Sequence, residues 1–459
     1  MQETQENHDG RTTVAFATLG CKANQYDSSF LEAQLRARRF RLVDFKEKAD
    51  IYIINTCTVT DRADLDSRNL IRRAARRNPE AFKIATGCYA QTKPGEVARV
   101  EGVDLVLGND KKARLLDYLE LGRPERPMIE VDDIFRQTEL ETFGMASYSK
   151  NTRAFVKIQD GCNQFCTFCI IPYARGRNRS IPIPRVLEEL RSLSERGFRE
   201  AVLTGIHIGT YGHDREPATS LLELLRAIEA TQPIHRVRVS SIDPEEVSEE
   251  MVELFAGSRV LCPHLHIPLQ AGDDEILRLM RRRYTVAEFA GLCERLAAKI
   301  PRLCIGTDVI VGFPYEDEAR FENTYALLRD GPVHYFHVFP FSPKRGTKAA
   351  QMLGQVPPTL KKAHAARLRA LSEVKSAEFR ARFVGEEVEV LLERAEDVCQ
   401  NGGHSEAVWT GFSENYLPVA VTTDSGFSGK LVRCRLEAKE GGNLAGKDQP
   451  GREKTAEGL

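Results

Sequence analysis

Three cysteines within eight residues constrain this chain more than any other feature. Cys162, Cys166 and Cys169 directly follow residues 155–159, whose alternating side chains predict a β-strand that runs into a glycine. Three thiolates in one loop suit a soft metal, but they are one ligand short of a closed zinc or iron–sulfur site. The loop therefore predicts a 4Fe–4S cluster in which one iron is open to an external ligand.

A zinc knuckle is the alternative interpretation of the same three cysteines. It would need a fourth ligand from elsewhere in the chain, such as His207 or Cys262. Zinc sites usually present their cysteines as two separated pairs, whereas these three lie in a single loop after a strand. The spacing therefore favours the iron–sulfur cluster.

Composition narrows the class of protein. The 459 residues are 29% charged and 42% hydrophobic, which is typical of a globular protein with about three domains. The formal net charge is −1, so any RNA contact has to come from local basic patches. The chain has neither a signal peptide pattern nor an apolar run near the ~18 residues that span a bilayer, so we expect a cytoplasmic protein without a membrane partner. In that compartment, eleven cysteines indicate metal binding rather than disulfides.

Residues 11–122 alternate between strand and helix patterns, which predicts a parallel α/β sheet. The predicted strands are 14–19, 50–55, 82–86 and 103–107, and the predicted helices are 28–39 and 63–77. Cys21, Cys57 and Cys88 each follow one of the first three strands. Because the carboxyl ends of parallel strands share one edge, we expect these cysteines to meet there and to hold a second metal cluster. Three unrelated buried cysteines are the alternative.

Arginines at helical spacing follow the second of these cysteines, and further arginines follow the loop of Cys169. Such runs are candidates for contacts with RNA phosphates, although a solvated surface helix explains a basic face equally well. The candidate residues are Arg68, Arg72, Arg76, Arg175, Arg177 and Arg179.

The remainder of the chain divides into four segments. Residues 123–150 are predicted to be a linker. Residues 151–379 contain six strand–helix units. Six units are too few for a closed eight-fold barrel and are therefore typical of a partial (β/α)6 barrel. The six predicted strands are 155–159, 200–205, 236–240, 264–269, 304–312 and 335–339. Residues 380–438 predict a small all-β barrel, and residues 439–459 have too little apolar content to fold and are expected to be disordered.

The Cys-x3-Cys-x2-Cys spacing, with Phe168 before the last cysteine, resembles the signature of radical S-adenosylmethionine (SAM) enzymes. In that family SAM chelates the open iron. The resemblance implies that SAM is also held at the ends of the barrel strands. The matching positions are Phe168, Ile170, Thr204, Gly205, Ser240, Gln270 and Gly312.

The order of the three predicted domains resembles the methylthiotransferases, whose last domain is an RNA-binding barrel called TRAM. The resemblance covers about residues 12–436, and residues 18–25, 54–60 and 170–177 look like the branch that acts on threonylcarbamoyladenosine in tRNA. It implies sulfur insertion and methyl transfer at C2 of N6-threonylcarbamoyladenosine, next to the anticodon. The tRNA is held by its anticodon stem-loop.

The same resemblance implies the cofactors and partners. Two 4Fe–4S clusters and two molecules of SAM per turnover are expected, with an electron donor such as flavodoxin or ferredoxin and a sulfur donor. Because cofactors carry the difficult chemistry, no side chain is assigned a catalytic role of its own.

The charge of the C-terminal barrel favours a different substrate. Residues 380–437 contain six basic and ten acidic residues, which suits a basic protein better than a phosphate backbone. Methylthiolation of a ribosomal protein aspartate or of isopentenyladenosine in tRNA is therefore an alternative, and an RNA-binding protein with structural metal is a non-enzymatic one. We favour threonylcarbamoyladenosine because the local motifs are more specific than a net charge.

Overall fold

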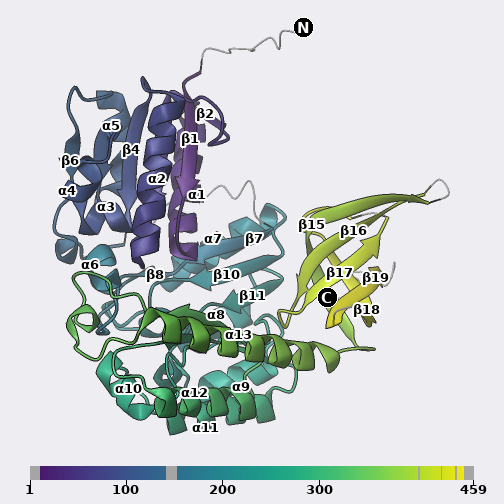
Figure 1. Ribbon diagram of the computed structural model, residues 1–459. Coiled ribbons are helices and arrows are strands. Elements are labelled where there is room, and N and C mark those ends of the chain that lie inside the picture. Colours follow the sequence, from purple (N-terminus) through teal and green to yellow (C-terminus); the bar gives the residue numbers. More distant parts are fainter. Residues whose placement is uncertain (1–10, 141–151, 402–403, 425, 440–441, 449–459) are drawn as a thin grey trace.

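The computed structural model (Figure 1) describes residues 11–140, 152–401, 404–424, 426–439 and 442–448. An N-terminal α/β sheet is followed by a curved parallel sheet with helices on its outside and then by a small closed β-barrel. The long helix α13 (Pro358–Ala381) runs along the curved sheet and leads into the barrel. This arrangement confirms the predicted α/β fold class.

The N-terminal sheet has six parallel strands in the order β2-β1-β3-β4-β5-β6. The strands are β1 (Thr13–Thr18), β2 (Arg41–Val43), β3 (Ile51–Thr56), β4 (Phe82–Gly87), β5 (Leu105–Leu107) and β6 (Met128–Glu130). The helices are α1 (Lys22–Ala37), α2 (Asp61–Arg77), α3 (Cys88–Thr92), α4 (Pro94–Ala98) and α5 (Leu115–Leu121). The central strands β3 and β4 are buried along their whole length, as expected of parallel strands covered on both faces.

The predicted linker is wrong at its start. Within residues 123–150, β6 pairs with β5 and forms the edge of the N-terminal sheet. A three-residue strand is too short for a period of two to be visible in the sequence. Residues 141–150 of that prediction lie outside the described part of the chain.

The curved sheet confirms the predicted partial barrel. Its six parallel strands are β7 (Arg153–Lys157), β10 (Glu200–Thr204), β11 (Arg236–Val239), β12 (His264–His266), β13 (Cys304–Val311) and β14 (Tyr335–Pro340). They form two three-stranded halves, joined by a parallel bridge between Ser241 and His266. The outer helices are α7 (Ile183–Glu195), α8 (Leu221–Thr231), α9 (Glu249–Gly257), α10 (Asp274–Met280), α11 (Val286–Lys299) and α12 (Glu318–Asp330).

Along these strands, alternate side chains face either the apolar core under the outer helices or the lumen inside the curved sheet. Ala154 and Val156 on β7, like Leu203 on β10, pack in the apolar core under the outer helices. The intervening side chains, such as Phe155 and Thr204, therefore face the inside of the curve.

The C-terminal barrel is closed in the order β15-β16-β17-β19-β18. Its strands are β15 (Glu387–Asn401), β16 (His404–Ser413), β17 (Pro418–Thr423), β18 (Leu431–Lys439) and β19 (Asn443–Asp448). The prediction that residues 439–459 are disordered is wrong for β19, which pairs with both β17 and β18 and buries Leu444. Backbone pairing stabilises this segment despite its low apolar content; residues 449–459 lie outside the described part.

The barrel is joined to the amino ends of the parallel strands by buried arginines. Arg238 on β11 donates to the carbonyl of Glu414 at 3.1 Å, and Arg236 donates to that of Glu389 at 3.0 Å. Both guanidinium groups are paired with the fully buried carboxylate of Glu200. Cys304 and Phe379 extend the apolar core of the barrel into the middle domain.

Candidate active site

The first cysteine triad lies in the loop between β8 (Gln159–Asp160) and α6 (Ile171–Arg175). Gly161 begins this loop at φ +81°, where a Cβ would come within 1.9 Å of the carbonyl oxygen of Arg177, so only glycine fits. Burial, followed by the nearby thiolates of Cys166 and Cys162, raises the pKa of Cys169 to about 12. Three thiolates held close together in this half-buried loop repel one another, and a bound cation offsets that repulsion. The donor set therefore fits a metal cluster.

Two cationic side chains contact the sulfurs of this triad. Arg282 Nη1 lies 3.5 Å from Cys166 Sγ and pairs with Asp243. His207 places Nδ1 3.6 Å from Cys162 Sγ. These contacts orient the thiolates and offset their charge.

Of the two fourth ligands in the zinc alternative, His207 contacts the triad and Cys262 does not. His207 Nε2 is held by Glu246 at 2.6 Å; burial lowers its pKa, but hydrogen bonds with Asp243, Cys162 and Glu246 outweigh burial and raise it to about 12. Cys262 precedes β12, at the opposite end of the barrel from the cysteine loop.

The second triad is brought together at the carboxyl edge of the N-terminal sheet. Cys21 immediately precedes α1, Cys57 follows β3, and Cys88 is the first residue of α3 after β4. A Cβ on Gly20 would lie 3.0 Å from Cys57 Sγ, which shows how closely two of these loops approach. Burial is the main cause that raises the pKa of Cys57 to about 11, and nearby Cys88 and Cys21 raise it further. The three thiols therefore lie close together at this edge, as the ligands of a soft metal cluster must.

Helix α6 connects the two triads. It begins two residues after Cys169 and packs against α3, directly below it in Figure 1. Its last residue, Arg175, places Nε 3.4 Å from Cys88 Sγ. The loop of one triad is thus rigidly connected to a ligand of the other.

A buried ionic cluster surrounds Arg175. Asp27 on α1 accepts hydrogen bonds from Lys112 at 2.8 Å, Lys157 at 2.6 Å and Arg175 at 2.9 Å. Burial alone would raise the pKa of Asp27, but these three cations hold it well below its usual range. Lys157 and Arg175 also pair with Asp160. The N-terminal and middle domains are therefore joined by buried charges of opposite sign that neutralise one another.

The predicted RNA contacts divide into two groups. Arg175 and Arg179 are only 2% and 7% exposed, so the prediction that they contact phosphates is wrong. The sequence did not reveal their burial, because the residues of the ionic cluster are far from them along the chain. Arg68 is half-buried and donates to the hydroxyl of Tyr89. Three predicted contacts are accessible: Arg76 and Arg177 are exposed, and Arg72 is partly exposed.

A cavity of about 620 Å³ lies between the second triad and the lumen of the partial barrel. Gly20, Cys21 and Lys22 line one end, and Tyr416 of the C-terminal barrel lines it beside Arg238. Of the residues matched to SAM contacts, Thr204, Gly205 and Ser240 line this cavity.

The other residues matched to SAM contacts do not line that cavity. Phe168 lies edge-on to Phe313, and Ile170 is buried after the cysteine loop. Gln270 bridges to β13 with its backbone at φ +63°, and a Cβ on Gly312 would meet the side chain of Lys361.

Among the polar side chains of the cavity wall, His337 was not identified from the sequence. Asp308 Oδ1 lies 3.0 Å from His266 Nε2 and 3.2 Å from His337 Nδ1. Burial would raise the pKa of Asp308, but the hydrogen bonds with the two histidines outweigh it and lower the pKa. The period-two alternation of β14 places His337 in the lumen between Tyr335 and Phe339, and this was the signal available in the sequence.

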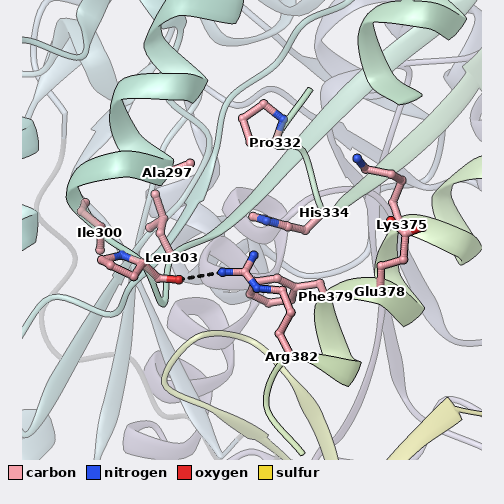
Figure 2. A pocket seen from close by; sticks show the side chains of 10 residues that line it. Ala297, Ile300, Leu303, Pro332, His334, Lys375, Glu378, Phe379 and Arg382 are labelled. Atoms are coloured by element: carbon pink, nitrogen blue, oxygen red, sulfur yellow. Dashed lines mark hydrogen bonds between the residues drawn. The ribbon is translucent and has the colours of Figure 1, made fainter. Parts of the chain in front are cut away.

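A smaller cavity of about 190 Å³ lies at the other end of β13 and β14, beside α13 (Figure 2). His334, Phe379 and Arg382 line it, and Arg382 donates to the carbonyl of Pro301 at 3.0 Å. None of its lining residues is a cysteine, so the large cavity is the candidate active site. No helix among the described residues is long and apolar enough to span a membrane.

A parallel partial barrel with a cysteine triad beyond its strand ends defines a radical SAM enzyme, and the comparisons agree. Residues 156–328 match the description "Radical SAM superfamily", and residues 13–108 match "Uncharacterized protein family UPF0004". The radical S-adenosylmethionine methyltransferase TsrM from Kitasatospora setae shares the fold, with a TM-score of 0.55 over 74% of this chain and 77% of its own, at 16% identity.

Relatives of known name extend over most of the chain. Threonylcarbamoyladenosine tRNA methylthiotransferase MtaB of Bacillus subtilis is 39% identical, covering 92% of this chain and 93% of the relative. The protein of that name from Aquifex aeolicus is 41% identical, covering 83% and 92%. The tRNA-2-methylthio-N(6)-dimethylallyladenosine synthase of Acetivibrio thermocellus is 31% identical, covering 94% and 89%. The chain belongs to the radical SAM methylthiotransferase family.

Proposed function

We propose that this protein methylthiolates C2 of N6-threonylcarbamoyladenosine next to the anticodon of tRNA. The carrying observation is that one cavity is lined both by Cys21 of the second triad and by Thr204, Gly205 and Ser240, the positions matched to SAM contacts. In this proposal, a base in that cavity reaches both cofactor sites. The relatives of 39% and 41% identity bear the name of this activity.

The two triads fit the cofactors that such a reaction needs. Cys162, Cys166 and Cys169 would hold one 4Fe–4S cluster with SAM, and the triad of the N-terminal sheet would hold the other. When bound, these groups supply the radical chemistry and the sulfur that an unactivated C–H bond requires. Three thiolates per site leave one iron open in each, as in a reactive rather than a structural site.

The chain itself positions and encloses the reactants. Arg282 and His207 hold the thiolates of the first triad, and the ionic cluster around Asp27 holds the second triad at a constant separation from the first. The lumen walls exclude water from the reacting base. The base has to leave its stack to enter the cavity.

The accessible arginines Arg72, Arg76 and Arg177 contact phosphates of the anticodon stem-loop in this proposal. An electron donor such as flavodoxin or ferredoxin and a separate sulfur donor complete the reaction. Both are cytoplasmic partners, and the protein acts in that compartment.

Anaerobic reconstitution with iron and sulfide tests the proposal. The holoenzyme is incubated with SAM, a reductant and one of three substrates: an anticodon stem-loop that carries threonylcarbamoyladenosine, one that carries isopentenyladenosine, or ribosomal protein. The modified nucleosides or peptides are identified by mass spectrometry. We expect the 2-methylthio derivative from the first stem-loop. Product from the isopentenyl stem-loop alone would assign the protein to the other tRNA branch, and product on a ribosomal protein alone would support the aspartate alternative.

A further inference from the structure

The cavity contains a cation without a partner. Lys22 begins α1 directly after Cys21, and its side chain is exposed into the cavity. Within the part of the chain that the structure describes, no hydrogen bond or ion pair engages its ammonium group. Arg153 lines the same cavity, although Glu393 already pairs with it at 2.7 Å. An ammonium group that lines a cavity without an anionic partner is stabilised by an anionic ligand.

The opposite wall offers hydrogen-bonding groups. His337 on β14 has a side chain that is 59% exposed, and its Nδ1 is occupied by Asp308. Its Nε2 is therefore available to a ligand. Asp308 also holds His266, so the orientation of this wall is determined by several hydrogen bonds.

The chemistry of the base directs its substituent into this part of the cavity. In adenine, C2 and C6 both neighbour N1, so a base that presents C2 to the two cofactor sites brings its N6 substituent into the same cavity. A threonylcarbamoyl group carries a carboxylate, a hydroxyl and N–H groups, whereas an isopentenyl group is apolar. Placing an apolar group here would desolvate Lys22, Asp308 and His337 without compensation.

We propose that Lys22 binds the carboxylate of the threonylcarbamoyl group, and that His337, held by Asp308, hydrogen-bonds the other polar atoms of that group. These two residues on opposite walls select the threonylcarbamoyl substrate over an isopentenyl one. The inference rests on the proposed function and adds to it the residues that recognise the substrate.

The test compares three anticodon stem-loops that carry threonylcarbamoyladenosine, its neutral threoninamide analogue, or isopentenyladenosine. Lys22→Met is expected to lower kcat/KM for the acid substrate about 10- to 100-fold, which is the usual effect of losing a charge-assisted hydrogen bond. The same substitution is expected to change kcat/KM for the amide substrate by less than about threefold. Lys22→Arg, which keeps the charge, is expected to restore most of the preference for the acid. Lys46→Met, which removes an exposed lysine outside the cavity, is the matched control.

Lys22 neighbours a cysteine of the second triad, so iron and sulfide are counted in every variant. His337→Phe, which is not adjacent in sequence to either triad, is expected to keep full iron content and to lose about tenfold in kcat/KM for the acid substrate. If wild-type protein does not modify the acid substrate, the proposed function fails. If wild-type protein modifies it, but iron-replete Lys22→Met keeps the wild-type preference for acid over amide and iron-replete His337→Phe keeps the wild-type kcat/KM for the acid substrate, the assignment of the recognition residues is overturned.

Discussion

Arg175 Nε lies 3.4 Å from Cys88 Sγ, so the helix that follows the first cysteine triad ends in a cation that contacts the second. The same guanidinium group pairs with Asp27 and Asp160. The distance between the two cofactor sites is therefore determined by buried charges rather than by a flexible connection.

Arg175→Met is expected to lower the free energy of unfolding by about 3–5 kcal/mol, because it leaves two buried carboxylates with fewer cations. Chemical denaturation measures this change. Arg177→Met is the matched control, since it removes an exposed guanidinium two residues further along. Equal destabilisation by both substitutions would contradict the structural role of the ionic cluster.

Cys57→Ala is expected to abolish methylthiolation and to leave SAM cleavage largely intact, because only the second triad loses a ligand. Iron content should fall from about eight to about four per chain. Cys293→Ala, in the apolar core under α11, should retain all of its iron. Parallel loss of SAM cleavage in Cys57→Ala would rule out a division of labour between the triads.

His334, in the smaller cavity, is expected to make stability depend on pH. Burial, followed by Arg382 and Lys375, lowers its pKa to about 3, so the unfolded chain binds this proton more readily than the folded one. The contribution of neutral His334 to the free energy of unfolding is complete above pH ~6.5. It is lost as the pH falls towards 3, at up to about 1.4 kcal/mol per pH unit. In the wild-type protein, the backbone amide of Ile305 donates to His334 Nδ1 at 2.9 Å. His334→Asn keeps an acceptor for this amide. Between these pH values, wild-type protein should lose stability more steeply than the variant; identical slopes would exclude this histidine as the cause.

Leu444→Asp is expected to open the C-terminal barrel, at a cost of about 3 kcal/mol or more, because it places a charge in an apolar core. Lys447→Asp changes an exposed residue of the same strand and is the control. Limited proteolysis of residues 387–439 reports opening of the barrel. Resistance equal to wild type in Leu444→Asp would show that β19 does not close it.

The sequence predicts the elements with long or strongly periodic patterns and misses those whose structure depends on distant contacts. All six predicted strands of the partial barrel are confirmed, and each is followed along the chain by at least one helix. The short strands β2 and β6 carry no readable period, and β19 is stabilised by pairing with two strands rather than by its own composition.

The same distinction holds for the site. The convergence of Cys21, Cys57 and Cys88 follows from parallel topology, in which strand ends share an edge. The burial of Arg175 does not, because its carboxylate partner Asp27 is 148 residues away in the sequence. Lys22 was likewise overlooked, since only the packing of the N-terminal sheet over the lumen places it in the cavity.

The first turns of α1 link three tasks in one rigid segment. Cys21 at its start belongs to the second triad, Lys22 lines the large cavity, and Asp27 joins two domains. An altered substrate preference is therefore difficult to evolve or engineer at this helix without disturbing sulfur insertion or domain assembly. His337 on β14 belongs to neither cysteine triad and not to the ionic cluster, so the opposite wall is where specificity is most free to diverge within this scaffold.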